Sequence, residues 1–114
     1  SENDVYAFLH KIRRRRMTIH KTGEGTSLTY SLEGRLDTTT APMLEGDLKH
    51  SVGDITELHF DFAKLEYISS AGLRVLLSAQ KVMNKQGTMT IANVNDTIME
   101  IFEVTGFVDI LTIV

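Results

Sequence analysis

Apolar and polar residues alternate along four short segments of the chain, and this period of two predicts half-buried β-strands. The clearest is residues 27–33, where Leu28, Tyr30 and Leu32 share one face. Residues 17–21 precede it across a turn with two glycines, so the pair is expected to form an antiparallel hairpin. The same alternation predicts two further strands, at residues 57–62 and 88–92.

Other segments carry apolar residues at helical spacing, and each precedes a glycine that suits the left-handed position after a helix. The predicted helices span residues 41–52, 70–86 and 96–105. Thr40 is expected to cap the first helix, and Asn95 or Asp96 the third. In the second helix, a buried stripe is predicted opposite an exposed one: Gly72, Leu76, Ala79 and Met83 against Arg74, Ser78, Lys81 and Lys85.

The order of these elements predicts an α/β fold with right-handed crossovers and partly parallel strands. Because one strand face is polar, helices are expected mainly on the other face. Residues 107–114 follow as a last strand or as an irregular apolar segment. We therefore expect a mixed β-sheet of about four to five strands with helices packed mainly on one face.

Charge separates the beginning of the chain from the rest. The chain holds 12 Lys and Arg against 15 Asp and Glu, yet residues 1–16 carry a net charge of +3 and residues 17–114 one of −6. A run of four arginines is typical of a nucleic-acid or anionic-lipid patch, but no second basic cluster follows, so general nucleic-acid binding is not expected. Residues 1–16 are an extension, an expression remnant or the end of a longer protein, with helical spacing of Val5, Phe8, Leu9 and Ile12.

Length and composition fit one domain, which we place at residues 17–114 of the 114. The chain has no cysteine, so a disulfide framework, a thiol nucleophile and a thiolate metal site are excluded. No apolar run has the roughly 18–20 residues that span a bilayer, and no signal peptide is recognised. These features lead us to expect a cytoplasmic protein without a transmembrane segment.

Two adjacent serines, Ser69 and Ser70, stand where the second helix is expected to begin, after a loop that follows the strand ending at Phe62. A serine at this position caps free backbone N–H groups. The same helix start would also tolerate a phosphate on Ser70, so a structural and a regulatory role both remain open. Gly72 in the first turn indicates a close approach, either by a neighbouring strand or by a partner.

Enzymatic and metal-binding alternatives have weaker support. Ser70 has no base beside it in the sequence, and the Gly-x-Ser-x-Gly elbow of a hydrolase is absent. His59 and Asp61 share one strand face, but no third metal ligand is evident. The chain has no glycine-rich phosphate loop of the Walker or Rossmann type. We expect no catalytic activity, no metal and no cofactor.

Three motifs in register resemble the STAS domain family (sulphate transporter and anti-sigma factor antagonist). They are Tyr-Ile-Ser-Ser-Ala-Gly-Leu-Arg-Val-Leu-Leu at residues 67–77, Gly-Arg-Leu-Asp at 34–37 before three threonines, and Ile-Phe-x-x-x-Gly-Phe-x-x-Ile at 101–110. The first is similar to the Asp-Ser-Ser/Thr-Gly-Leu signature of the antagonists. Ser69 replaces the usual Asp, and Ala71 the second Ser or Thr. The resemblance implies the STAS fold over nearly all of residues 17–114.

The resemblance also implies a phosphorylation switch at Ser70, with Ser69 as the alternative acceptor. The partners would be an anti-sigma factor serine kinase, which the unmodified domain binds, and a Ser/Thr phosphatase that resets the switch. The implied partner-binding residues are Asp37, Thr38, Thr39, Ser69, Ser70, Ala71, Gly72, Leu73 and Arg74. Asp37 can equally well cap the threonine turn, and an exposed arginine such as Arg74 is more often a solvated charge than a binding residue.

Two other functions remain open. The domain can be an unphosphorylated STAS scaffold subunit of a transport or sensory complex, in which both serines only cap the helix. It can also be a small-molecule or nucleotide-binding domain, which ligand-induced stabilisation would reveal. The sequence leaves the oligomeric state open between a monomer and a weak dimer.

Overall fold

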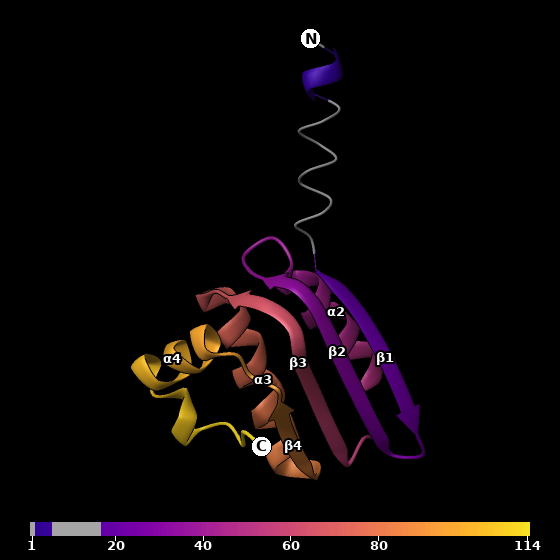
Figure 1. Cartoon of the computed structure of the whole chain (residues 1–114). Helices are drawn as coiled ribbons and strands as arrows, with labels where there is room; N and C mark the ends of the chain where they lie inside the picture. Colours follow the sequence, from indigo (N-terminus) through magenta and orange to yellow (C-terminus); the bar gives the residue numbers. More distant parts are fainter. Residues whose placement is uncertain (1, 6–16) are drawn as a thin grey trace.

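The computed structural model describes residues 2–5 and 17–114, and its chain alternates strands and helices in the predicted order (Figure 1). The basic run and most of the helical pattern predicted before it lie outside the described residues. Within residues 17–114 the elements are β1 (Thr18–Glu24), β2 (Ser27–Leu36), α2 (Ala41–Ser51), β3 (Glu57–Ile68), α3 (Ser70–Gln86), β4 (Thr88–Ala92), α4 (Asp96–Thr105) and the 3-10 turn η1 (Phe107–Asp109).

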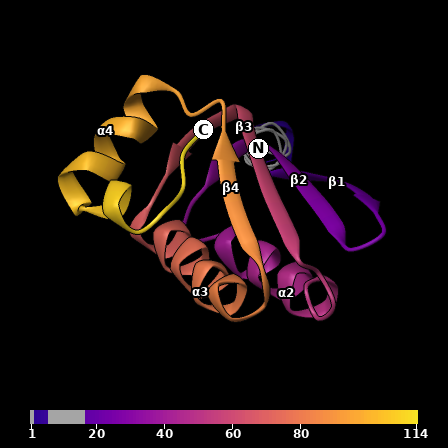
Figure 2. The ribbon, with the colours of Figure 1, turned by 90° about the horizontal axis from the view of Figure 1, so that it is seen from below.

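The four strands form one mixed sheet in the order β1-β2-β3-β4. β1 pairs antiparallel with β2 as the predicted hairpin, whereas β2–β3 and β3–β4 are parallel pairs. The crossover helices α2 and α3 lie side by side under one face of the sheet (Figure 2). This confirms the predicted α/β class and the one-sided placement of these helices.

The core lies between that face and the two crossover helices. Tyr30, Leu32, Phe60 and Phe62 point into it and are at most 1% exposed. The ring of Tyr30 stacks on Phe60 with centroids 5.6 Å apart. The predicted stripes of α3 are both present, since Gly72, Leu76, Ala79 and Met83 are buried while Arg74, Ser78, Lys81 and Lys85 are exposed.

β3 corrects the prediction that this strand ends at Phe62. It continues to Ile68, so only Ser69 separates it from α3, and the expected loop is absent. Its pairing with β2 shifts register twice, and each shift inserts one extra residue into β3. A bulge of this kind reverses the inside–outside alternation. Ala63 and Lys64 are both exposed ahead of the buried Leu65, so the alternation breaks here and the sequence looks like the end of a strand.

The prediction of a left-handed glycine after each helix holds only for α4, where Gly106 has φ +80°. α2 ends on the right-handed Val52, ahead of Gly53, which is not among the positive-φ glycines of the described residues. Gly87 after α3 is extended, with φ 173°. A Cβ there would lie 1.9 Å from the carbonyl oxygen of Thr56, so a close backbone approach and not the helix end requires this glycine.

The C-terminal segment is irregular, the second of the two predicted outcomes. After η1, only an isolated parallel bridge joins Ile113 to Ile91 of β4. Asn95 is the N-cap of α4, one of the two predicted candidates. Its side-chain oxygen accepts from Ile98 N at 2.8 Å, and its amide donates to Leu65 O of β3 at 3.0 Å. None of the helices in the described part of the chain is long and apolar enough to cross a membrane.

Candidate functional site

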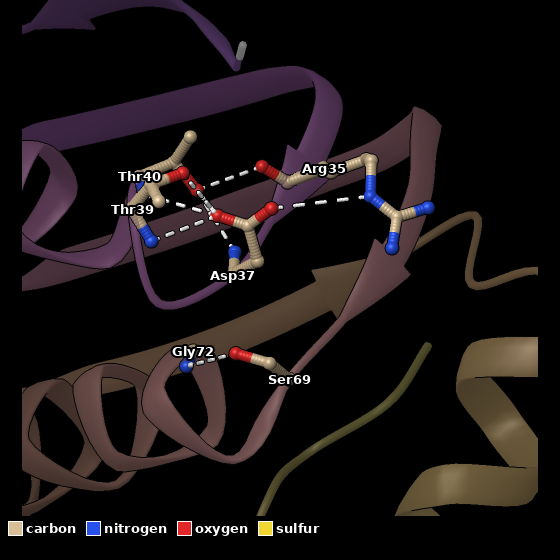
Figure 3. Close-up of polar contacts among 6 residues, drawn as sticks. All are labelled: Arg35, Asp37, Thr39, Thr40, Ser69 and Gly72. Atoms are coloured by element: carbon tan, nitrogen blue, oxygen red, sulfur yellow. Dashed lines mark hydrogen bonds and ion pairs between the residues drawn. The ribbon is translucent and has the colours of Figure 1, made fainter. Parts of the chain in front are cut away.

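The ends of β2 and β3 bring the two predicted site segments together. These neighbouring strands are parallel, and the backbone N–H of Ser69 donates to Leu36 O at 2.8 Å, directly after the last paired residues. The turn after β2 and the start of α3 therefore lie at the same edge of the sheet (Figure 3). Asp37 and the serine pair, distant in sequence, belong to one surface.

Asp37 organises the turn between β2 and α2. Its Oδ1 accepts hydrogen bonds from the Thr39 backbone (3.0 Å), the Thr39 hydroxyl (2.8 Å) and the Thr40 backbone (3.1 Å). Partial burial alone would raise the pKa of this carboxyl, but these donors outweigh it and lower the pKa below its ordinary value. The carboxylate thus has a clear structural role as the cap of the threonine turn.

Thr40 differs from its expected role. It occupies the position before α2, but its side chain makes no capping bond to the helix. Its hydroxyl instead donates to Arg35 O at 2.8 Å and accepts from Asp37 N at 2.8 Å. Asp37 instead accepts the free backbone N–H groups at the start of α2. Its carbonyl accepts from Ala41 N at 2.8 Å, and its carboxylate accepts from the N–H groups of Thr39 and Thr40.

Arg35 and Tyr67 are further residues at this edge. The Arg35 guanidinium carbon lies 4.5 Å from the centroid of the Tyr67 ring, and its Nε lies 3.9 Å from Asp37 Oδ2. The two residues are register partners on β2 and β3. Both stand in the quoted motifs, but their contact depends on the second bulge of β3. No signal in the separate motifs indicates that pairing.

The two serines have different environments. Ser69 is the N-cap of α3, and its hydroxyl accepts from Gly72 N at 3.4 Å, a long hydrogen bond. Ser70 is the first residue of the helix and is exposed. Its hydroxyl makes no hydrogen bond within the described residues. The structure therefore assigns capping to Ser69 and leaves the Ser70 hydroxyl accessible.

Gly72 is held against the strands. A Cβ on Gly72 would lie 2.7 Å from both Ile68 Cγ1 and Leu36 Cγ. The close approach inferred from the sequence is therefore made by the neighbouring strands. Leu73 is also buried, at 6% exposure. The side chains of the predicted partner surface that reach solvent are Thr38, Thr39, Ser70 and Arg74, with Asp37, Ser69 and Ala71 half-buried.

A shallow groove of about 300 Å³ runs between α2 and α3 beside this edge. Thr38, Ala71 and Arg74 of the predicted surface line it. Pro42, Glu45, Val75 and Ser78 also line it, and they were not predicted as site residues. Ser78 could have been found from the sequence, because it follows Arg74 at i, i+4 spacing on the predicted exposed stripe of the helix. The pairing of α2 with α3 that closes the groove is a tertiary feature.

The polar pair considered for a metal has other partners. His59 Nδ1 lies 2.7 Å from the Thr90 hydroxyl. Asp61 Oδ1 accepts from Asn93 at 3.0 Å and from Ala63 N at 2.9 Å, and these bonds lower the pKa of its carboxyl. Within residues 2–5 and 17–114, no three His, Asp or Glu side chains gather as metal ligands.

Comparison with known proteins identifies the family of this chain. The family model described as STAS domain matches residues 17–114, which is the whole of the sheet and its helices. The chain belongs to the STAS domain family. A candidate anti-sigma factor antagonist, BtrV of Bordetella bronchiseptica, is 35% identical to it over 85 residues, covering 72% of each chain. The anti-sigma-B factor antagonist of Bacillus subtilis is 27% identical, covering 73% of this STAS chain and 77% of the relative.

Solved structures show the same fold. An anti-sigma factor antagonist from Mycobacterium paratuberculosis superposes with a TM-score of 0.77 at 21% identity, covering 85% of this chain and 84% of the other. The Bacillus cell fate determinant SpoIIAA, solved in its phosphorylated form, gives a TM-score of 0.68 at 16% identity, covering 85% and 91%. At these identities the likeness concerns the STAS fold alone.

Proposed function

We propose that this STAS domain is an anti-sigma factor antagonist that binds its partner through the edge formed by the Asp37 turn and the start of α3. The observation that carries the proposal is the exposure of Ser70 at the first position of α3, beside the α2–α3 groove. The curated relatives named as antagonists support the same role. The domain acts by reversible binding and not by catalysis.

Phosphorylation of Ser70 is the proposed switch. An anti-sigma factor serine kinase transfers the γ-phosphoryl group of ATP to Ser70 Oγ, so the Oγ–P bond forms, the bond to the bridging oxygen breaks, and ADP and the hydroxyl proton leave. The product adds roughly −1.5 to −2 charge to an exposed helix start. Together with the Asp37 carboxylate already at this edge, the phosphate charge repels an acidic surface of the partner. A Ser/Thr phosphatase restores the binding form.

Ser69 stands where antagonists usually have aspartate, and it keeps the capping role of that residue but not its negative charge. Serine and aspartate are both good N-caps, and Ser69 accepts from Gly72 N in this role. The substitution therefore keeps the helix start but withdraws one negative charge next to the acceptor. We infer that the partner kinase of this protein does not require that charge.

Paired baits test the role and the acceptor together. The full chain with Ser70→Ala and with Ser70→Asp is used to capture proteins from a lysate of the source cells, and the captured proteins are identified by mass spectrometry. We expect a protein with a serine kinase domain on Ser70→Ala and not on Ser70→Asp. The captured kinase is then purified and incubated with ATP and the wild type, Ser69→Ala or Ser70→Ala.

The expected phosphorylation pattern is incorporation into the wild type and Ser69→Ala, and none into Ser70→Ala. Incorporation lost only in Ser69→Ala would move the acceptor to Ser69. Partners that bind both baits equally would overturn the switch and support the scaffold function. Stabilisation of the isolated domain by a nucleotide or other small molecule, with no protein captured, would support the ligand-binding alternative.

A further inference from the structure

Arg74 lies one helical turn after Ser70 on the exposed side of α3. Side chains at i and i+4 of a helix are neighbours, with Cβ atoms about 5–6 Å apart. Because Cα–Cβ bonds tilt toward the helix N-terminus, the longer side chain at i+4 leans over the residue at i. The Arg74 guanidinium can therefore reach a group attached to Ser70 Oγ without any change in the helix.

Arg74 has no acidic partner within the described residues. Glu45, the acidic residue lining the same groove, pairs with Lys49 of its own helix at 3.2 Å. The Asp37 carboxylate is occupied by the threonine turn and by Arg35. The first turn of α3 contains no acidic residue. Arg74 thus carries an unpaired guanidinium one helical turn after the neutral, accessible hydroxyl of Ser70.

We propose that Arg74 binds the phosphate of phosphorylated Ser70, an inference that rests on the proposed modification of this serine. A guanidinium presents planar N–H donors that match phosphate oxygens two at a time, and such charge-assisted bonds are stronger than neutral ones. Modification of Ser70 therefore creates an ion pair within α3. The phosphate is held over the mouth of the α2–α3 groove instead of projecting into solvent.

This pair also explains how phosphorylation changes the groove. In the unmodified domain, Arg74 is the cationic side chain among the groove residues and is free to bind a carboxylate of the partner protein. In the phosphorylated domain the same guanidinium is bound to phosphate. The modification thus adds negative charge and removes the positive anchor in one step, so an acidic partner is released by both effects.

Phosphorus NMR of the full chain with phosphoserine incorporated at position 70 during translation tests the pair directly. This protein requires no kinase, so the result is independent of the partner. An adjacent arginine stabilises the phosphate dianion and lowers its second pKa. We expect this pKa in the wild type to be lower than in Arg74→Gln by about half a unit. Arg74→Lys, which keeps the charge but loses the planar fork, is expected between them.

Lys81→Gln is the matched control, because it removes the same charge from the same exposed stripe about 16 Å along the helix from Ser70. Its phosphate pKa should equal that of the wild type. The difference between wild type and Arg74→Gln should shrink in 1 M salt. Amide spectra of the unphosphorylated variants verify that each remains folded.

Two outcomes would overturn the pair: equal phosphate pKa values in the wild type and Arg74→Gln, or an equal shift in Lys81→Gln. Either result leaves the proposed phosphorylation of Ser70 standing if the kinase assay is positive. Conversely, a clear shift in Arg74→Gln together with no phosphorylation by any captured kinase would retain the phosphate-binding geometry and contradict the proposed function. The two proposals therefore fail separately.

Discussion

The turn after β2 and the start of α3 lie at the same edge of the sheet but are held in opposite ways. In the turn, one carboxylate oxygen of Asp37 collects three donors within 3.1 Å, and Thr40 adds bonds to the strand backbone. At the start of α3, the side-chain bond is a single long one, from Gly72 N to Ser69 at 3.4 Å. The turn is a framework fixed by hydrogen bonds, whereas α3 is fixed by packing.

This difference explains how the fold could accommodate the proposed phosphorylation of Ser70. A phosphate on a residue that carries hydrogen bonds of the framework would break them. Ser70 carries none in the described structure, and the position of its helix is set by the buried glycine behind it. A phosphate on Ser70, as proposed, would therefore change the charge of this surface without breaking a hydrogen bond that holds the fold.

Gly72→Ala is expected to have the largest effect on stability. Its Cβ would lie 2.7 Å from Ile68 Cγ1 and Leu36 Cγ and 3.0 Å from the Leu36 carbonyl oxygen, so α3 must move away from the strands. We expect the free energy of unfolding to fall by about 2–3 kcal/mol, as overpacking in a core commonly produces. Urea unfolding followed by circular dichroism measures this change.

Gly46→Ala is the matched control for that experiment. Gly46 lies in α2, and a Cβ there meets nothing within 4 Å. Since alanine has the higher helix propensity, Gly46→Ala should stabilise the domain by about 0.5–1 kcal/mol. Equal effects of the two substitutions would show that propensity, and not packing, governs the start of α3.

Asp37→Ala is expected to have the next largest effect. It removes the acceptor of the Thr39 and Thr40 donors, and we expect a loss of about 1–2 kcal/mol. Asp54→Ala makes the same change at an exposed aspartate in another turn and should alter stability by less than about 0.5 kcal/mol. If both variants behaved alike, the Asp37 turn would contribute no more than an ordinary surface loop.

The pH dependence of stability sharpens this comparison. The pKa of Asp37 is lowered in the folded domain, so its contribution is present above the unfolded value of about 4 and is lost as the pH falls through the folded value. The stability difference between wild type and Asp37→Asn should therefore narrow below about pH 4. Asp47 and Asp61, whose pKa values are also lowered, are common to both proteins. A constant difference across this range would contradict a charge-dependent turn.

Ser69→Ala should have the smallest effect of the series. Loss of an N-cap costs about 1 kcal/mol in general, and the length of this bond places the expected loss near 0.5 kcal/mol. The adjacent Ser70→Ala supplies the control, because this exposed hydroxyl makes no bond within the described residues, and no loss is expected. A larger loss for Ser70→Ala than for Ser69→Ala would reverse the assignment of the cap.

Much of this architecture could be predicted from the sequence, because periodicity reports burial directly. Alternation located β2 and the first half of β3, and helical stripes located α3. The second half of β3 was missed because its two bulges, visible only in the pairing with β2, interrupt the alternation. The alternation of residues within one segment does not show which strand pairs with it, and the bulges of β3 are stabilised by that pairing.

Some residues of the candidate site could likewise be predicted from the sequence, and others could not. The serine pair and Asp37 were found through motifs, since each stands at an element boundary where capping residues are recognisable. Thr40 was assigned to the wrong bond, because an Asp three residues before it takes the capping role. The contact of Arg35 with Tyr67 depends on strand register, which single segments do not encode.

A partly buried polar network away from the site could not be predicted from the sequence pattern either. Tyr30 was predicted only as an inward apolar face, yet its hydroxyl donates to Asp47 Oδ1 at 2.7 Å, and Lys21 Nζ lies 2.9 Å from the same oxygen. Burial raises the pKa of Tyr30 above its ordinary value, and the Asp47 carboxylate contributes to that rise. Polar partners from β1 and α2 meet here only after the hairpin and the crossover have formed.

The bond from Ser69 N to Leu36 O has a consequence for the order of assembly. It is the last rung between two strands that are distant in sequence, and it closes only when the crossover through α2 has brought them into register. Such non-local contacts form late, because the loop between them must be closed first. The native helix start at Ser70 therefore requires that β2, α2 and β3 have already assembled. The proposed kinase, in recognising this helix start, would act on molecules in which these three elements are assembled and not on nascent chains.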